Sequence, residues 1–163
     1  MSDGLVVDVD DLVGQPGASR GFSGRRSVTL KLGDTVVDGP MQVAGSVRGT
    51  VDGVIAGFTA SAPAHFTCVR CLTEWDDVVE VEGTQHFGSI PDEDGYAIVD
   101  RAVDVSGPAT DELSLGIPSS PLCRPDCRGL CPICGNDLNS EPCDGHGEDP
   151  DSPFAALRDL FDP

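Results

Sequence analysis

The stretch MQVAGSVRGTVDGVIAGFTASA, residues 41–62, decides the fold class because apolar and small side chains recur at every second position. A period of two places such side chains on one face of an extended strand. In the first half this face consists of Met41, Val43, Gly45, Val47, Gly49 and Val51. Asp52-Gly53 then interrupts the alternation. An Asp-Gly pair between two alternating runs predicts a β-hairpin with a type I′ turn, whose two central residues need positive φ.

Two further alternating segments flank this hairpin. SVTLKL, residues 27–32, sets Val28, Leu30 and Leu32 against polar neighbours. In residues 74–87 the apolar positions of the alternation are Trp75, Val78 or Val79, and Val81. About four antiparallel strands are therefore expected between residues 27 and 88. The predicted class is mainly β (α+β), with a small antiparallel curled sheet or a partly open barrel.

The segments on either side of the strands differ in character. Residues 1–26 form a weakly structured lead, in which LVVDVDDLV fits a strand or a short helix and QPGASRGFSGRR reads as a loop. After the strands, YAIV adds one more candidate strand. Asp104 is the candidate N-cap of a short helix over residues 105–115, provided that Pro108 lies in its first turn.

The chain ends in a second helical pattern. In SPFAALRDLF, Ser152 suits the N-cap and Pro153 the first helical position. Phe154, Leu157, Leu160 and Phe161 recur at helical spacing. The sequence thus divides into the lead (1–26), a β-rich domain (27–118), a cysteine-rich segment (119–147) and a tail with a terminal amphipathic helix (148–163).

Charge and hydropathy limit the possible partners. The chain has 28 acidic and 10 basic residues and a net charge of −18, which repels naked nucleic acid unless the cations are concentrated locally. It contains no run of eighteen apolar residues, so no membrane partner is expected. The N-terminus MSDGLVVDVDDL lacks the basic start of a secretory signal. We expect a cytoplasmic protein with reduced thiols.

Five of the seven cysteines lie in PLCRPDCRGLCPICGNDLNSEPC, residues 121–143, and the other two form CVRC at Cys68 and Cys71. Two residues between a pair of cysteines allow a tight turn to direct both sulfurs at one point. In CPICG, Gly135 supplies the backbone conformation that such a turn needs. Two C-x-x-C pairs in a cytoplasmic chain predict structural zinc, with one or two ions.

The eight candidate ligands are Cys68, Cys71, Cys123, Cys127, Cys131, Cys134, Cys143 and His146. The favoured arrangement joins the first four across the sheet and closes the last four into a local knob. One alternative is a single ribbon of the two C-x-x-C pairs. Another is a local site formed by Cys123, Cys127, Cys131 and Cys134, which leaves the upstream pair as free thiols.

We predict that these sites are structural and that the protein is not an enzyme. A catalytic zinc keeps an open position for water, whereas sulfur-rich tetrahedral sets are closed. A thiol-redox enzyme, the competing interpretation, would place one C-x-x-C at the start of a helix in a βαβ unit. Neither C-x-x-C pair has that setting, and the sequence shows no nucleophile elbow or phosphate-binding loop.

Four stretches together resemble the YceD family of large ribosomal RNA accumulation proteins. They are LVVDVDDLVGQPG, FTCVRCL, PSSPLCRPDCRGLCPICGNDLN and DPDSPFAALRDLF. The resemblance implies a bacterial cytoplasmic protein needed for the synthesis, processing or stability of large-subunit (23S) ribosomal RNA. The family's tails often carry a cysteine at the position of His146, where this chain departs from the pattern.

The leading hypothesis is a non-enzymatic ribosome-biogenesis factor that acts beside large-subunit ribosomal RNA or its precursor, ribosomal proteins or processing enzymes, and not on DNA. The candidate RNA- or partner-binding residues are Arg70, Arg124, Arg128, Arg25 and Arg26, with Arg20 in the same N-terminal cluster. The alternative is a zinc-stabilised protein–protein adaptor in transcription or RNA processing that makes no direct RNA contact.

Overall fold

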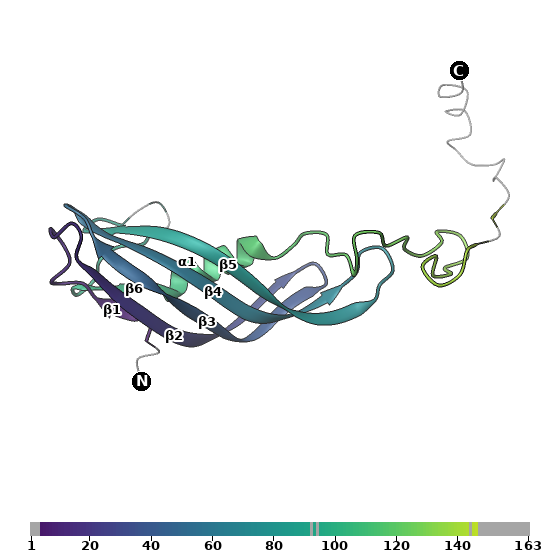
Figure 1. The fold of residues 1–163 in the computed structure, drawn as a ribbon, viewed down its shortest axis with the longest axis horizontal. Coiled ribbons are helices and arrows are strands. Elements are labelled where there is room, and N and C mark those ends of the chain that lie inside the picture. Colours follow the sequence, from purple (N-terminus) through teal and green to yellow (C-terminus); the bar gives the residue numbers. More distant parts are fainter. Residues whose placement is uncertain (1–3, 92, 94, 144, 147–163) are drawn as a thin grey trace, which may run out of the picture.

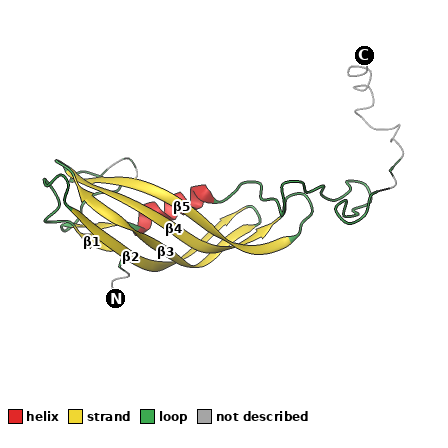
Figure 2. Cartoon of the chain, in the orientation of Figure 1, coloured by secondary structure: helices red, strands yellow, loops and turns green. Residues whose placement is uncertain are grey.

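The computed structural model describes residues 4–91, 93, 95–143, 145 and 146. Its elements, in chain order, are β1 (Val6–Asp8), β2 (Ser19–Leu32), β3 (Thr35–Gly49), β4 (Gly53–Thr67), β5 (Glu74–Gly88), β6 (Ala102–Asp104) and α1 (Ser106–Gly116). Long twisted strands dominate, and one short helix lies against them (Figures 1 and 2). The predicted mainly β class is therefore confirmed. No described helix has the length and apolar character needed to cross a membrane.

The main sheet has four antiparallel strands in the order β2-β3-β4-β5. This confirms the four strands expected between residues 27 and 88. The two outer strands, β2 and β5, do not pair with each other in the described chain, so the sheet stays open and curled rather than closing into a barrel (Figure 1). Each strand follows its neighbour through a hairpin, the arrangement with the shortest possible connections.

One face of this sheet is covered, and we call it the inner face. It carries the alternating side chains Val37, Met41, Val43 and Val47 of β3, all of which are buried in the hydrophobic core. The α1 helix packs on the same face against β5 and β4. Beside it, β1 pairs with β6 in a small two-stranded sheet that adds Val7 and Val103 to the core. The other face, which we call the open face, has no such cover in the described chain.

The predicted short helix is confirmed, one residue later than expected, so its N-cap is Val105 and not the predicted Asp104. The α1 helix spans Ser106–Gly116, and Pro108 lies in its first turn. The Ser106 N–H donates to the Asp104 carboxylate at 2.9 Å, so this carboxylate satisfies one of the donors that a helix start leaves free. Ile117 ends the helix in an extended conformation, which is the conformation favoured for a residue before a proline such as Pro118. The predicted terminal helix lies outside the described residues.

Two predictions near the sheet ends are wrong. Residues 19–26 are not a loop, because β2 begins at Ser19 and pairs with β3 from there on. The ladder with β3 satisfies their backbone and outweighs the weak strand preference of the glycines and serines. YAIV is likewise not a regular strand, since Ala97 and Val99 form only isolated bridges. The strand in this region is β6, which pairs with β1.

The hairpin at residues 41–62 is confirmed, but its predicted type I′ turn is wrong. Beyond the Gly49–Val54 pair, the Thr50 N–H donates to the Gly53 carbonyl at 2.9 Å, so Val51 and Asp52 lie between the bonded residues, and neither Asp52 nor Gly53 has positive φ. Gly53 is required for a different reason. A Cβ at this position would lie 2.2 Å from the Phe87 carbonyl oxygen of β5, closer than any side chain allows.

A row of alternating phenylalanines and glycines crosses the inner face of the sheet. Phe22 of β2 pairs with Gly45 of β3, which pairs with Phe58 of β4, which pairs with Gly83 of β5. A Cβ on Gly83 would lie 2.6 Å from the Phe58 ring. Gly83 thus leaves the space that the Phe58 ring fills, and Gly45 allows the close approach of the β4 backbone at Gly57 and Phe58. Glycines of this kind support strong curvature of a sheet. This curvature brings the strands around α1.

We expect Gly45→Ala to destabilise the fold by about 1–3 kcal/mol, the usual cost of overpacking a core. The new Cβ would lie 2.1 Å from the Gly57 carbonyl oxygen, so backbone atoms would have to move. Gly57→Ala is the matched control, because a Cβ there meets nothing within 4 Å. Urea unfolding followed by circular dichroism measures both. Equal stability of the two variants would contradict the proposed role of the row.

Candidate metal centres

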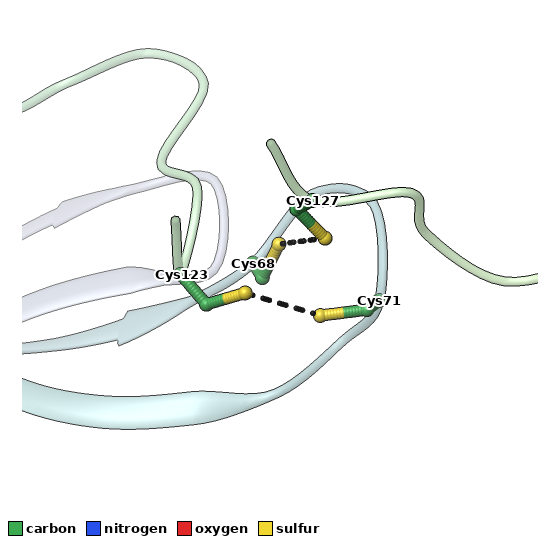
Figure 3. A group of neighbouring side chains, drawn as sticks. All are labelled: Cys68, Cys71, Cys123 and Cys127. Atoms are coloured by element: carbon green, nitrogen blue, oxygen red, sulfur yellow. Dashed lines mark hydrogen bonds between the residues drawn. The ribbon is translucent and has the colours of Figure 1, made fainter. Parts of the chain in front are cut away.

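Four cysteines from two distant parts of the chain meet at one end of the sheet, and we call this set the clasp. Cys68 and Cys71 lie in the loop that joins β4 to β5, while Cys123 and Cys127 lie in the segment after α1. The four sulfurs lie within 4.8 Å of one another. Figure 3 shows the four side chains pointing toward a common centre. The clasp therefore joins the β4–β5 loop to the C-terminal segment.

The sulfur spacings fit a tetrahedral metal and not disulfides. Cys68 Sγ lies 3.8 Å from Cys127 Sγ, and Cys71 Sγ lies 3.5 Å from Cys123 Sγ. A disulfide brings two sulfurs to about 2.05 Å. A zinc ion with Zn–S distances of about 2.3 Å separates its sulfurs by about 3.8 Å in a regular tetrahedron. All seven cysteines are free thiols, so the donor set is chemically complete for a metal.

Backbone donors favour the ionised form of Cys68. Burial opposes ionisation, yet the backbone N–H groups of Cys123, Cys71 and Arg70 outweigh it and bring the pKa of Cys68 down to about 6. Metals bind the thiolate rather than the thiol. The loop is thus built to hold one negative sulfur in a buried position.

The Thr73 hydroxyl also lowers the pKa of Cys71, whereas ionisation of Cys123 in the same set is opposed. The hydrogen bond from the Cys123 thiol to Cys71, together with burial, raises the pKa of Cys123 to about 12. Close sulfurs resist ionising together for the same reason that paired carboxylates do. A cation at the centre would remove this repulsion, because it attracts every sulfur around it. The clasp therefore has the electrostatics of a site that is completed by a cation.

The second set consists of Cys131, Cys134, Cys143 and His146, whose ligand atoms also lie within 4.8 Å of one another. Cys143 Sγ lies 3.8 Å from Cys131 Sγ, 3.9 Å from Cys134 Sγ and 3.1 Å from His146 Nε2. Backbone N–H groups of Cys134 and Ile133 lower the pKa of Cys131 to about 6. The two sets match the favoured grouping from the sequence, and the two C-x-x-C pairs do not share one set.

The two C-x-x-C loops have the same backbone design. In each loop the first cysteine accepts hydrogen bonds from the N–H groups two and three residues later. Its carbonyl accepts the N–H of the residue four positions later, Leu72 or Gly135, at 2.9 Å in both. That residue has positive φ, +59° in Leu72 and +76° in Gly135. Gly135 adopts this conformation without strain, whereas Leu72 does not.

Two residues that were not predicted as part of the site, Asp137 and Asn139 of the GNDLN stretch, lie beside the clasp. The Asn139 side-chain amide lies 3.6 Å from Cys127 Sγ as a donor, and its oxygen accepts the Arg128 N–H at 2.8 Å. Asp137 in turn accepts the Asn139 amide at 2.7 Å. Hydrogen bonds from Asn139 lower the pKa of Asp137. Polar groups of this kind orient metal ligands, and short Asx residues after a C-x-x-C turn are the signal for them.

The candidate arginines fall into two regions. Arg70, Arg124 and Arg128 flank the clasp, where Arg70 donates to the Cys127 carbonyl at 2.8 Å and Arg124 lies 3.5 Å from the Asp126 carboxylate. Arg25 and Arg26 lie on β2. Arg26 is hydrogen-bonded to Ser106 and lies 3.7 Å from Asp104. Arg20, on the same strand, forms two 2.9 Å contacts with the Asp11 carboxylate.

These features define a mainly β protein with two four-residue sets that fit a metal, one shared between the β4–β5 loop and the C-terminal segment and one within that segment. Residues 56–161, which include every cysteine, match the family described as "Large ribosomal RNA subunit accumulation protein YceD". The chain therefore belongs to the YceD family.

Curated relatives come from mycobacteria. An uncharacterized protein of Mycobacterium tuberculosis is 35% identical over 125 residues, which cover 72% of this chain and 60% of that protein. An uncharacterized protein of Mycobacterium leprae is 30% identical over 172 residues, covering 98% of this chain and 78% of that protein. The chain thus spans 60% of the length of the Mycobacterium tuberculosis and Mycobacterium bovis proteins that it matches. No solved structure gives a significant match.

We expect Leu72→Gly to be about 1 kcal/mol more stable than Leu72→Ala, because only glycine adopts the left-handed conformation without strain. Both variants remove an exposed side chain, so the loss of packing is similar. Urea unfolding followed by the fluorescence of Trp75, the only tryptophan, gives the difference. Identical midpoints would show that the loop carries no strain at Leu72.

Proposed function

We propose that this protein is a non-enzymatic ribosome-biogenesis factor that supports the synthesis, processing or stability of large-subunit (23S) ribosomal RNA. The observation that carries the proposal is its membership of the YceD family, whose description names accumulation of this RNA. The match spans both cysteine sets, so the features of the candidate metal centres lie within the family region. The proposed location is the cytoplasm, where ribosomes are assembled.

We further propose that each set binds one structural zinc ion. The support is the donor chemistry, four sulfurs in the clasp and three sulfurs with one imidazole in the second set. Zinc would hold the C-terminal segment against the β4–β5 loop. The free energy of zinc binding would then contribute directly to the free energy of folding. Four protein ligands leave no open position for water, which supports a non-catalytic role.

A thiol-redox enzyme is the less favoured proposal. Cys68 and Cys131 both have a lowered pKa, as a reactive cysteine would. Each, however, lies within a set of four close ligand atoms, and Cys68 is completely buried. A metal bound in such a set would coordinate the thiolate, which would then not be free to act as the nucleophile of redox chemistry. The lowered pKa values are therefore better explained by metal binding.

The proposed partners are ribosomal RNA or its precursor, ribosomal proteins and processing enzymes. The net charge of −18 favours basic proteins among them. It also supports the second candidate function, a zinc-stabilised adaptor that recruits such proteins without touching RNA. Binding of the purified protein to a ribosomal protein, with no binding to RNA at low salt, would favour the adaptor.

Zinc content tests the ligand sets. Plasma mass spectrometry of the wild-type protein should give about two zinc ions per chain, and Cys68→Ser and Cys131→Ser should each retain about one, because each set is four-coordinate. His86→Gln is the control, since His86 lies on β5 outside both sets and should retain two. Loss of all zinc in either cysteine variant would support the single-ribbon alternative instead.

Deletion of the gene tests the biological role. We expect the deletion strain to contain less mature large-subunit ribosomal RNA, or more of its precursor, relative to small-subunit RNA. Northern analysis across growth phases and temperatures measures these ratios. The wild-type gene should restore them, and Cys68→Ser should restore them less well. Unchanged ratios under all conditions would contradict the proposed function.

A further inference from the structure

The open face of the sheet is mostly polar and is uncovered in the described chain. It is formed by alternate residues of each strand, which lie on the side opposite α1. Its centre carries small polar side chains and a shallow hollow of about 410 Å³. The side chains that line this hollow include Ser23, Arg25, Gln42, Ala44, Thr59 and Ser61. Such a face offers hydrogen-bond donors but little apolar surface for a protein partner.

The lysine and arginine side chains fall into two groups, those that form ion pairs with acidic residues and those that do not. Arg20, Arg26, Arg101 and Arg124 each lie within 4.0 Å of an aspartate carboxylate. Arg70 donates to a backbone carbonyl of the clasp. Among the described residues, Arg25, Lys31, Arg48 and Arg128 form no ion pair. In a chain with 28 acids, four such cations are a small and specific set.

Three of these four cations lie in one line on the open face. Arg25 and Lys31 share the outward register of β2, and Arg48 of β3 pairs with Ser19, which has the same register. All three side chains are exposed. Lys31 lies six residues after Arg25 on β2, and Ser19, the partner of Arg48, lies six residues before it. At the rise of a β-strand, neighbouring cations of the line are therefore about 20 Å apart. Between them lie Ser23 and Ser27, whose hydroxyls can also donate to an anion.

The acids of the open face lie mainly on the opposite edge of the sheet. Strand β2 carries four basic residues and no acid, whereas β5 carries five acids and no lysine or arginine. Glu80 and Glu82 of β5 face outward, in the same cross-strand rows as Arg25 and Ser23. Asp38, which lies beside β2, accepts a hydrogen bond from Thr29 at 2.7 Å. A polyanion would therefore be attracted along β2 and repelled from β5.

We propose that the line of Arg25, Lys31 and Arg48 on the open face binds the phosphate backbone of RNA. The inference rests on the proposed role in ribosomal RNA accumulation and adds the surface through which RNA would be held. Evenly spaced cations with hydroxyls between them suit a repeating anion, and phosphate contacts of this kind do not depend on base sequence. The cations beside the clasp have structural partners or lie apart from this line.

Fluorescence anisotropy with a labelled 20-nucleotide oligouridylate and a 20-base-pair RNA duplex tests the proposal. Three contacts to a single strand give a salt slope of about −2, so wild-type affinity should fall about twentyfold between 50 and 200 mM salt. The variant Arg25→Ala, Lys31→Ala, Arg48→Ala should bind more weakly and lose nearly all of this salt dependence. Circular dichroism melting verifies that the variant is folded.

The matched control is Arg101→Ala, Arg124→Ala, Arg128→Ala, which removes the same charge from other surfaces and should keep the wild-type slope. Equal weakening of both triple variants, or no binding of either RNA by the wild-type protein at 50 mM salt, would overturn the proposal. Complementation of the deletion strain distinguishes failure of the proposed binding face from failure of the proposed function. If the line variant restores ribosomal RNA fully, the binding face is wrong while the proposed function stands.

Discussion

The C-terminal segment depends on four sulfurs that the fold brings within 4.8 Å of one another and on what can hold them there. Along the described chain the hydrophobic core ends at Ile117, so residues 118–146 are not held by a core of their own. They are held by the clasp and by backbone bonds such as Val69 N–H to Pro121 O at 3.0 Å. A cation among the sulfurs would turn their mutual repulsion into attraction, so metal binding and folding of this segment would be one process.

The sheet forms the hydrophobic core separately from the clasp, and it does so with few large side chains. One helix of 11 residues covers the inner face, and the Phe22–Gly45–Phe58–Gly83 row lets the strands curve around it. Because only one face is covered, the other is free to carry polar and charged groups. The same strands therefore provide the core on one side and the proposed binding surface on the other.

Strict alternation, as in residues 41–62, made strands β3 and β4 predictable, and ligand counting indicated both cysteine sets. The start of β2 was not predictable, because Gly-Ser-Arg sequence has weak strand preference and its pairing with β3 decides its structure. The prediction of a type I′ turn at Asp52-Gly53 was wrong for a related reason. Gly53 is required because the Phe87 carbonyl of β5 lies too close for a side chain, and this contact comes from another strand. Roles set by distant contacts, such as that of Asn139, leave no periodic pattern in the sequence.

The candidate ligands and the three cations of the proposed RNA-binding line occupy different parts of the chain. Every candidate ligand lies within residues 56–161, the region that matches the family, whereas Arg25, Lys31 and Arg48 all precede it. If the two sets hold zinc as proposed, the ligands stabilise one end of the sheet, whereas the cations line β2 and β3 on its open face. Removal of that zinc would then disturb the C-terminal segment first and leave the pairing of β2 with β3 intact. What holds this protein together and what it binds are accordingly separable questions, each open to mutation without the other.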